Sequence, residues 1–439
     1  MVLQDAKSKH EQIMEITNQN VITSKELGII HLSDENELLD GRHIRIRGKE
    51  TINFGTCGYM GLEMDDRLKA GVIDAVQKYG TAFASTRVYV NVKLYAEMEE
   101  LLRKMFNKPV MLLANVTLSH VSNIPILVND NDAVILDTQV HDSVQTAVQL
   151  LKARNVRIEV IRHNRMDHLE EKINELKGQY KKIWYMADGV YSMFGDCAPM
   201  TDIYSLLDKY EQFNLYIDDT HGMSWTGPNG TGYVMSAVPY FHDKMILVTS
   251  LNKAFGAAGG ITVFPNEKIH EFARNCSKPF IFSGPIQPPM LGACIASAKI
   301  HLTPEITTMQ KQLNDRVNYV NSLCKEYELP LMWENNTPIF FIGVSKPMVA
   351  FSMVKRLMNR GFLFNLSVFP SVAINNAGLR LPISRNHTFE DLKGLISNIA
   401  EELPDAFKES NITAKEVYRA FKKPYPYQKK QPDIRFELP

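Results

Sequence analysis

The chain has 439 residues, of which 45% are hydrophobic and 22% are charged, the balance of an ordinary globular protein. Lysine plus arginine and aspartate plus glutamate number 49 each, so no net charge favours nucleic acid or an anionic membrane as a partner. The five cysteines show no C-x-x-C spacing, which argues against a zinc site or a disulfide framework and predicts a reducing, cytoplasmic location. One core rarely grows to this length, so we expect at least two domains.

Residues 1–50 are polar and are predicted to form a separate N-terminal segment. Within it we expect a short helix over 8–18, and near its end begins the strand-like run HIRIRGKETINF. The first residues lack the apolar run of a signal peptide, and no window approaches the length of a transmembrane helix. Any membrane contact is therefore expected to be peripheral.

Residues 51–300 alternate between helical and strand-like patterns. The segment LYAEMEELLRKMF places its apolar residues on one helical face. Further along, helical segments such as HLEEKINELK separate most of the short β-rich runs, which are VMLL, AVILD, RIEVIRH, KIWYMAD, NLYIDD, MILVTS and GITVF. This alternation predicts an α/β domain with a mainly parallel seven-stranded sheet.

The rhythm changes after residue 300. A long helix, the strands FFIGV and LRLPIS, and further helices predict a smaller α+β domain over 301–420. Residues 421–439 form a basic, proline-rich tail that is expected to be disordered or extended. A docking strip for an acidic carrier protein is the alternative interpretation of this tail.

Polar side chains follow several of the predicted parallel strands. Lys253 lies in TSLNKAFGAAGG, Asp218 and His221 lie in YIDDTHG, and His141 follows AVILD. Ligands of open α/β sheets bind where strands end, so these residues are expected to share a site. A strand-end aspartate is often only a helix cap, and a lone histidine or lysine is usually structural or solvated. The combination instead matches the needs of pyridoxal phosphate.

Each of these side chains suits one part of that cofactor. Asp218 could pair with the pyridine nitrogen, Lys253 could form the Schiff base, and the flat ring of His141 could stack on the cofactor. Ser250 and the step Leu118-Ser119-His120 are the candidates for binding its phosphate. No pair of histidines has the spacing of metal ligands, so no metal site competes with this interpretation as a cofactor site.

Longer motifs resemble the α-oxoamine synthases, which are pyridoxal phosphate enzymes of fold type I. The resemblance covers about residues 50–400 and rests on NFGTCGYMGLEMDD, YGTAFASTRVY, VHDSVQTAVQLLKA, DGVYSMFGDCAPM, YIDDTHGMSWTGPNGTG, TSLNKAFGAAGG, FIFSGP and LRLPISRNHTFEDL. It implies the fold-type-I transferase architecture, with a large cofactor-binding domain and a smaller C-terminal domain.

The resemblance also implies roles for single residues. Lys253 is similar to the Schiff-base lysine, Asp218 to the partner of the pyridine nitrogen, His221 to the partner of the phenolic oxygen, and His141 to the stacking histidine. These four residues form the predicted catalytic set. Further predicted cofactor contacts are Ser192, Ser250, Ser119, His120, Ser283 and Gly284.

Substrate contacts are implied in the same way. Arg380 is similar to the arginine that binds the substrate carboxylate, as a guanidinium does in bidentate fashion. Cys57 and Tyr59 are expected to lie beside the amino acid, although the family often has asparagine near Cys57. Ser283 is predicted to reach the phosphate of a neighbouring subunit, which implies a homodimer with shared active sites.

The implied reaction joins an amino acid to an acyl thioester of coenzyme A or acyl carrier protein, with loss of carbon dioxide. Serine or cysteate and a long-chain acyl group are the favoured substrates, as in sphingolipid- or sulfonolipid-like synthesis. An aminotransferase acting on a small amino and keto acid pair is the alternative enzyme. A cofactor-binding domain without activity is a third interpretation, against which Lys253, Asp218 and Arg380 all argue.

Overall fold

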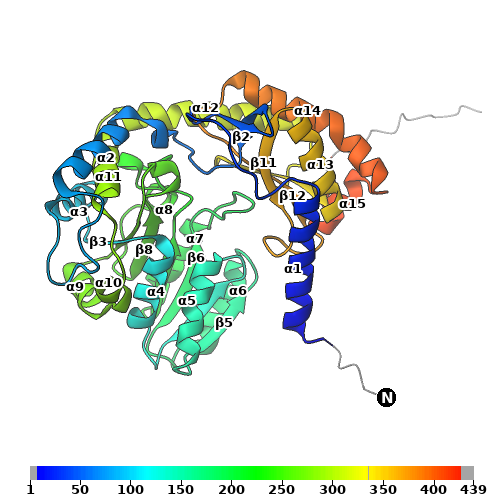
Figure 1. Ribbon diagram of the computed structural model, residues 1–439. Helices are drawn as coiled ribbons and strands as arrows, with labels where there is room; N and C mark the ends of the chain where they lie inside the picture. The colour runs from blue at the N-terminus through cyan, green and yellow to red at the C-terminus, as the bar shows by residue number, and fades with distance from the viewer. Residues whose placement is uncertain (1–6, 335, 427–439) are drawn as a thin grey trace, which may run out of the picture.

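Two β-sheets organise the computed structural model, which describes residues 7–334 and 336–426 (Figure 1). The larger sheet has seven strands in the order β3-β9-β8-β7-β6-β4-β5. Strand β9 is antiparallel to its neighbours β3 and β8, and the other pairs are parallel. The predicted mainly parallel seven-stranded sheet is therefore confirmed. The strands are β3 (Val110–Leu113), β4 (Ala133–Asp137), β5 (Arg157–Ile161), β6 (Ile183–Asp188), β7 (Phe213–Asp218), β8 (Met245–Ser250) and β9 (Gly260–Val263).

Helices cover both faces of this sheet because its strands are apolar on both sides. In β3, Val110 and Leu112 belong to one core, whereas Met111 and Leu113 belong to the other. The first core is covered by α3 (Lys93–Phe106), α6 (Met166–Leu176), α7 (Met200–Lys209), α8 (Tyr233–Ala237) and α11 (Pro288–His301). The second is covered by α4 (Val116–Leu127), α5 (Asp142–Lys152), α9 (Glu267–Cys276) and α10 (Lys278–Phe282). Helix α2 (Asp66–Tyr79) packs on α11.

The smaller sheet has five strands in the order β1-β2-β11-β12-β10. Helix α12 (Glu305–Glu326) runs along the top of Figure 1 between the two lobes. The strands are β1 (His43–Ile46), β2 (Lys49–Phe54), β10 (Ile339–Ser345), β11 (Phe362–Ser367) and β12 (Ala377–Pro382). The remaining helices of this lobe are α13 (Pro347–Asn359), α14 (Phe389–Glu409) and α15 (Ala414–Ala420).

We expected residues 1–50 to form a separate N-terminal segment, but part of that segment pairs with the smaller lobe. Strands β1 and β2 form a hairpin, and β2 pairs in parallel with β11, with Ile52 opposite Phe362. Strand β11, which lies between β2 and β12 in the sheet, was not predicted from the sequence. Pairing between residues some 300 positions apart follows from tertiary packing, which a local pattern does not encode. We therefore propose that the smaller domain combines residues 43–54 with the C-terminal part of the chain.

Helix α1 (Lys9–Glu26) is longer than the predicted helix over 8–18. Ser8 and Glu11 form a capping box at its start, and Asn20 Nδ2 donates to the Phe369 carbonyl at 2.9 Å. Figure 1 draws α1 as an arm that leaves the smaller lobe. Of the predicted tail, residues 427–439 lie outside the described residues. In the part of the chain that the structure describes, no helix combines the length and apolar character needed to span a bilayer.

Three short 3-10 helices complete the described elements. They are η1 (Leu62–Met64), η2 (Pro228–Gly230) and η3 (Lys253–Phe255). The first and third lie against each other. This contact brings the segment that carries Tyr59 close to the segment that carries Lys253.

Candidate active site

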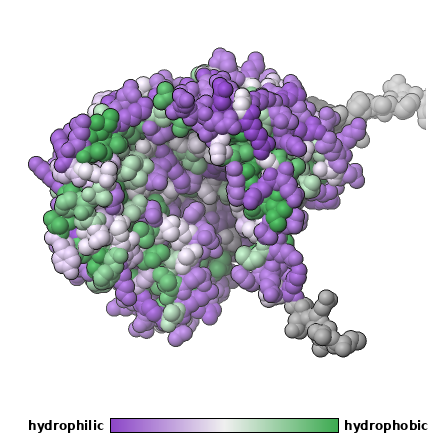
Figure 2. Space-filling model, in the orientation of Figure 1, coloured by the Kyte–Doolittle hydropathy of each residue, from purple (hydrophilic) through white to green (hydrophobic). Residues whose placement is uncertain are grey.

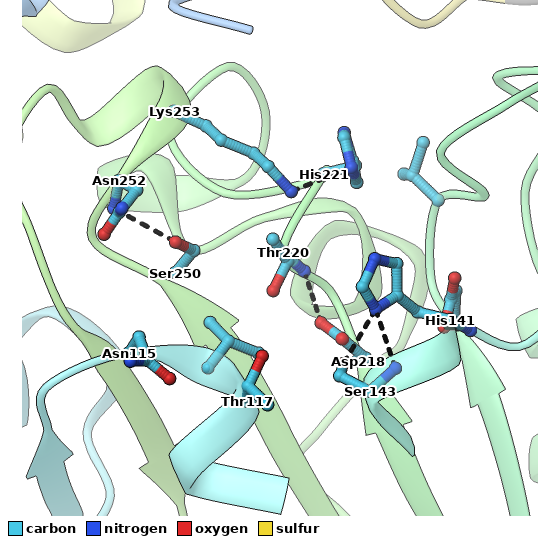
Figure 3. A pocket seen from close by; sticks show the side chains of 13 residues that line it. Asn115, Thr117, His141, Ser143, Asp218, Thr220, His221, Ser250, Asn252 and Lys253 are labelled. Atoms are coloured by element: carbon cyan, nitrogen blue, oxygen red, sulfur yellow. Dashed lines mark hydrogen bonds between the residues drawn. The ribbon is translucent and has the colours of Figure 1, made fainter. Parts of the chain in front are cut away.

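A cavity of about 200 Å³ opens where strands β6, β7 and β8 end (Figure 3). The parallel strands bring their carboxyl ends to one edge of the sheet, which is where such folds bind ligands. Five predicted site residues line it, namely His141, Asp218, His221, Ser250 and Lys253. The lining also includes residues that the sequence did not single out for this site, among them Asn115, Val116, Thr117, Ser143, Thr220 and Asn252.

Lys253 begins the 3-10 helix that follows β8, and its backbone has a φ of 47°. This left-handed conformation is strained for a residue with a side chain and is typical of functional sites. The small residues after it allow close approach of two other segments. A Cβ at Gly256 would lie 2.7 Å from Leu62 Cβ, and a Cβ at Gly260 would lie 2.6 Å from the Asn115 carbonyl. The glycines thus let the segments around the site close on the lysine.

The Lys253 amino group lies 2.8 Å from His221 Nε2, and the dashed line in Figure 3 marks this contact. Burial lowers the pKa of Lys253, and the nearby Arg380 guanidinium lowers it further. Burial also lowers the pKa of His221, helped by the charge of Lys253. The neutral forms of both groups are therefore favoured, and a neutral lysine is the form that can act as a nucleophile or base.

Tyr59 connects His221 with Arg380. Its hydroxyl lies 2.8 Å from His221 Nδ1 and 3.5 Å from Arg380 Nη2. Arg380 Nη2 also lies 3.5 Å from the Cys57 sulfur, while Arg380 Nε donates to the Ser192 carbonyl at 2.6 Å. The structure thus brings together five residues that the sequence predicted from distant positions.

Two carboxyl groups stand side by side at the ends of β6 and β7, where Asp188 is the register partner of Asp218. Burial raises the pKa of Asp188, and the charge of Asp218 raises it further. Burial also opposes ionisation of Asp218, but hydrogen bonds, above all the one from His120, outweigh burial and lower the pKa of Asp218. One neutral and one ionised carboxyl are therefore expected at neutral pH, with the negative charge on Asp218.

His141 is held over the cavity by the start of α5. Its Nδ1 accepts the Ser143 backbone N–H at 3.2 Å and lies 2.7 Å from the Ser143 hydroxyl. The His141 backbone N–H donates to Asp188 Oδ1 at 3.1 Å. These contacts leave the ring near Asp218, as Figure 3 shows. A flat side chain in this place fits the predicted stacking role.

The start of α4 forms one end of the cavity. Asn115 caps this helix by accepting the Leu118 N–H at 2.8 Å, and Val116 and Thr117 line the cavity. The first N–H groups of a helix have no partner within the helix and bind anions well. Ser250 lines the same cavity, and its hydroxyl accepts the Asn252 N–H at 3.0 Å. This end therefore suits a phosphate group.

Ser119 and His120 do not line that cavity, although we expected them to bind the phosphate. They lie within the first turns of α4 and are fully buried, and the Ser119 hydroxyl donates to the Asn115 carbonyl. The step at Val116 and Thr117 occupies the expected place instead. The capping asparagine after the strand VMLL was the signal that could have located the helix start.

A second, larger cavity of about 840 Å³ adjoins the first, since Lys253 and His221 line both. Cys57, Ser192 and Arg380 line the larger cavity. Its walls come from α1, the loop after α1, β1, the segment 53–57, β11 and the loop that follows β11. Figure 2 shows the hollow between the two lobes in which these surfaces face one another. The smaller cavity thus opens toward a site with room for a large substrate.

Ser283 and Gly284 lie away from both cavities. Ser283 ends α10, and the adjacent Phe282 side chain is 81% exposed. They therefore make no cofactor contact within this chain. The predicted contact of Ser283 with the phosphate of a neighbouring subunit stays a prediction.

Comparison with known proteins agrees with this geometry. The family model of aminotransferase class I and II matches residues 49–399. An 8-amino-7-oxononanoate synthase of Thermosipho melanesiensis is 31% identical over 358 residues, which are 80% of this chain and 88% of that protein. Another from Alkaliphilus metalliredigens is 28% identical over 387 residues, or 87% of this chain and 93% of that protein. A serine palmitoyltransferase structure from S. paucimobilis has a TM-score of 0.82 at 22% identity, covering 92% of this chain and all of that one, and so supports the fold.

The chain therefore belongs to the aminotransferase class I and II family. Within that family its relatives place it among the α-oxoamine synthases, as its motifs predicted. The predicted fold type, the assignment as an enzyme and the prediction of pyridoxal phosphate as cofactor are thereby confirmed.

The residues present fit that cofactor. An ionised carboxylate, a buried lysine, a flat histidine and a helix start surround one cavity. Asp218 would hold the pyridine nitrogen, Lys253 the aldehyde carbon, and Val116, Thr117 and Ser250 the phosphate. Among the described residues, no group of histidine, cysteine, aspartate and glutamate side chains has the arrangement of a metal site.

Proposed function

We propose that the chain condenses an amino acid with a long-chain acyl thioester to give an α-oxoamine. The observation that carries this proposal is the meeting of the cofactor cavity and the larger cavity at Lys253 and His221. In the overall reaction, a bond forms between the amino acid Cα and the acyl carbon. The bond from the acyl carbon to sulfur breaks to release a thiol, and the bond from Cα to the carboxylate breaks to release carbon dioxide.

Bound pyridoxal phosphate supplies an electron sink for the pair of electrons that remains on Cα after proton loss. Lys253 moves that proton, and its lowered pKa makes the neutral amine available near neutral pH. Asp218 keeps the negative charge that pairs with a protonated ring nitrogen. Arg380 orients the substrate carboxylate, since its guanidinium reaches the larger cavity from β12.

His221 binds oxygen atoms at the junction of the two cavities, and the buried Tyr59, which lines neither cavity, holds the ring of His221 in place. His221 lies between Lys253 and Tyr59, with contacts of 2.8 Å on both sides. A neutral imidazole in this position can donate a hydrogen bond to the phenolic oxygen of the cofactor or to the thioester carbonyl. Such preorganised donors stabilise charge that develops on oxygen during acyl transfer.

The larger cavity supports a long acyl chain as the second substrate. Much of its wall is apolar, from residues including Val21, Ile29, Ile30, Leu32, Ile44, Ile46, Leu363, Phe364, Val368 and Phe369. An apolar channel beside the reacting carbon gains free energy from each methylene that it removes from water. Serine or cysteate is the proposed amino acid, which would place the enzyme in sphingolipid- or sulfonolipid-like synthesis.

The acyl donor is proposed to be a thioester of coenzyme A or of an acyl carrier protein. Both deliver the acyl group on a long, flexible arm, and the larger cavity extends from Lys253 to residues of α1 and β11. The free cysteines of the described chain support a reducing location, which we propose to be the cytoplasm.

A homodimer with shared active sites is also proposed. Phe282 and Tyr89 are 81% and 89% exposed, and Phe83 is half exposed. Large exposed apolar side chains near Ser283 are typical of an interface. Phe282→Glu is expected to shift sedimentation toward the monomer and to weaken cofactor retention. A variant that sediments like the original chain would contradict this interface.

An aminotransferase remains the second candidate, because Asp218 and Lys253 would serve it equally well. It would require a small keto acid, for which a channel of about 840 Å³ is unnecessary. The decisive experiment mixes purified protein with a long-chain acyl thioester and each amino acid in turn, and follows free thiol together with the visible spectrum. Thiol release with one amino acid supports the synthase. Spectral change without thiol from either carrier, followed by turnover with keto acids, supports the aminotransferase.

A further inference from the structure

A buried chain of hydrogen bonds lies behind Asp218, on the side away from Lys253. His120 Nε2 lies 2.9 Å from Asp218 Oδ2, and His120 Nδ1 lies 2.9 Å from the Tyr216 hydroxyl. Relative exposures are 0% for His120, 1% for Tyr216 and 4% for Asp218. The three side chains come from α4 and β7, so regular elements hold them in place.

The order of donors in this chain follows from chemistry. An ionised Asp218 carboxylate can only accept, so His120 Nε2 must carry the proton that it shares with Asp218. In a neutral imidazole the other nitrogen is then an acceptor, and the Tyr216 hydroxyl must donate to it. Burial strongly raises the pKa of Tyr216, so the hydroxyl keeps its proton. The hydrogen bond of Tyr216 thus stabilises the tautomer of His120 in which a donor faces Asp218.

Asp218 needs this donor because of its neighbour. Asp188 stands beside it on β6, and burial alone would leave Asp218 neutral. Its Oδ1 already accepts the Thr220 N–H at 2.9 Å. His120 supplies the donor to the other oxygen, which is the contact that most lowers the pKa of Asp218. When its pKa is low, the Asp218 carboxylate is a weak base. The proton that it shares with the ring nitrogen of the bound cofactor then stays on that nitrogen.

We propose that Tyr216 and His120 are positioning residues that keep Asp218 ionised and oriented, so that the bound cofactor remains protonated at its ring nitrogen. The inference rests on pyridoxal phosphate as cofactor, but on neither proposed substrate. It gives His120 a role on the far side of Asp218 from the cavity. Neither residue touches substrate or cofactor, and both act through Asp218.

The first test needs no substitution and no substrate. Nitrogen NMR of the cofactor-free protein with labelled histidine reports which ring nitrogen of His120 carries the proton. Protonated Nε2 with unprotonated Nδ1 is the expected result. Protonated Nδ1 with bare Nε2 would overturn the proposal. Failure of the synthase assay leaves this measurement unaffected, so the two proposals fail independently.

Tyr216→Phe is the second test. Without the hydroxyl, His120 Nδ1 loses its hydrogen-bond partner, and the NMR signals of His120 are expected to change. We expect the visible absorption of the bound cofactor to shift and cofactor retention to weaken about tenfold, as is usual for outer-shell partners. Tyr185→Phe is the matched control, since Tyr185 is equally buried in the same sheet but its hydroxyl lies near Asp137. Equal spectra in both variants would overturn the proposal.

Two substitutions of His120 distinguish its hydrogen bond to Asp218 from the space that its side chain fills. The amide of His120→Gln can still donate toward Asp218, whereas His120→Leu cannot. The proposal expects the absorption spectrum of the loaded glutamine variant to stay near the original and that of the leucine variant to shift. Equal shifts in both, with unchanged circular dichroism, would show that shape alone matters and would overturn it.

Discussion

Lys253 and His221 meet at 2.8 Å exactly where the two cavities join. They come from the ends of adjacent parallel strands, β8 and β7, whose backbone pairing fixes the spacing between them. Burial lowers the pKa of both groups. The junction therefore favours the neutral forms of the amine and of the imidazole more than water does.

Replacement of the lysine tests the centre of this site. Lys253→Ala is expected to lower thiol release by about 10²- to 10⁴-fold or more, because proton transfer by a positioned base alone contributes that range. Lys268→Ala is the control, since Lys268 is an exposed residue of α9. The assay follows free thiol at saturating substrate. Normal turnover in the Lys253→Ala variant would contradict the assignment.

Two neighbouring positions on α1 test the acyl channel. The side chains of Val21 and Ile22 are similarly exposed, at 37% and 39%, but of the two only Val21 lines the larger cavity. Val21→Trp is expected to raise KM for a long-chain acyl thioester about tenfold or more, which is the scale on which a hydrophobic pocket discriminates chain length. KM for a short-chain thioester should change little. Ile22→Trp should leave both constants unchanged, and equal effects of the two substitutions would argue against an acyl chain along α1.

Thiol labelling tests the electrostatics of the substrate site. Although burial favours the neutral thiol, the Arg380 guanidinium and its neighbours lower the pKa of Cys57. Burial instead raises the pKa of Cys294 and Cys324 to about 12. We expect iodoacetamide at neutral pH to modify Cys57 and the exposed Cys276, but not the other two. Peptide mass spectrometry should find that the substrate amino acid protects Cys57 and not Cys276.

The pH dependence of stability should report His163. Burial disfavours its charge, but hydrogen bonds to Asp137 and Asp196 outweigh burial and raise the pKa of His163 to about 9. The contribution of His163 to the free energy of unfolding is fully present below the pKa of about 6.5 that histidine has in the unfolded chain. This contribution, on the order of 3 kcal/mol, is lost as the pH rises through about 9. The urea midpoint should therefore fall across this window.

His163→Gln should remove most of that fall. The variant is expected to start from a lower midpoint near pH 6 and to approach the original chain above pH 9. His10→Gln is the control, because His10 is exposed on α1. A parallel fall in the original chain and in His163→Gln would exclude His163 as its source.

Much of the fold was predictable because local patterns encode it. Seven apolar runs, most of them separated by helical segments, predicted a mainly parallel sheet. Because Asp218, His221 and Lys253 follow the ends of such runs, the sequence also predicted that they share one site. The sequence predicted one strand-like run at residues 43–54, which the structure divides into the hairpin of β1 and β2. The parallel pairing of β2 with β11 was not predicted, because partners so distant in sequence leave no local periodicity.

The sequence by itself therefore determined the cofactor chemistry, since that chemistry depends on residue types placed at strand ends. Only the tertiary structure decided which face of α4 meets the cavity. A difference of a few residues along a helix turns a side chain from the cavity to the core. That rotation places Val116 and Thr117 at the cavity and buries His120 behind Asp218. The larger cavity likewise exists only because the two ends of the chain fold together beside Lys253.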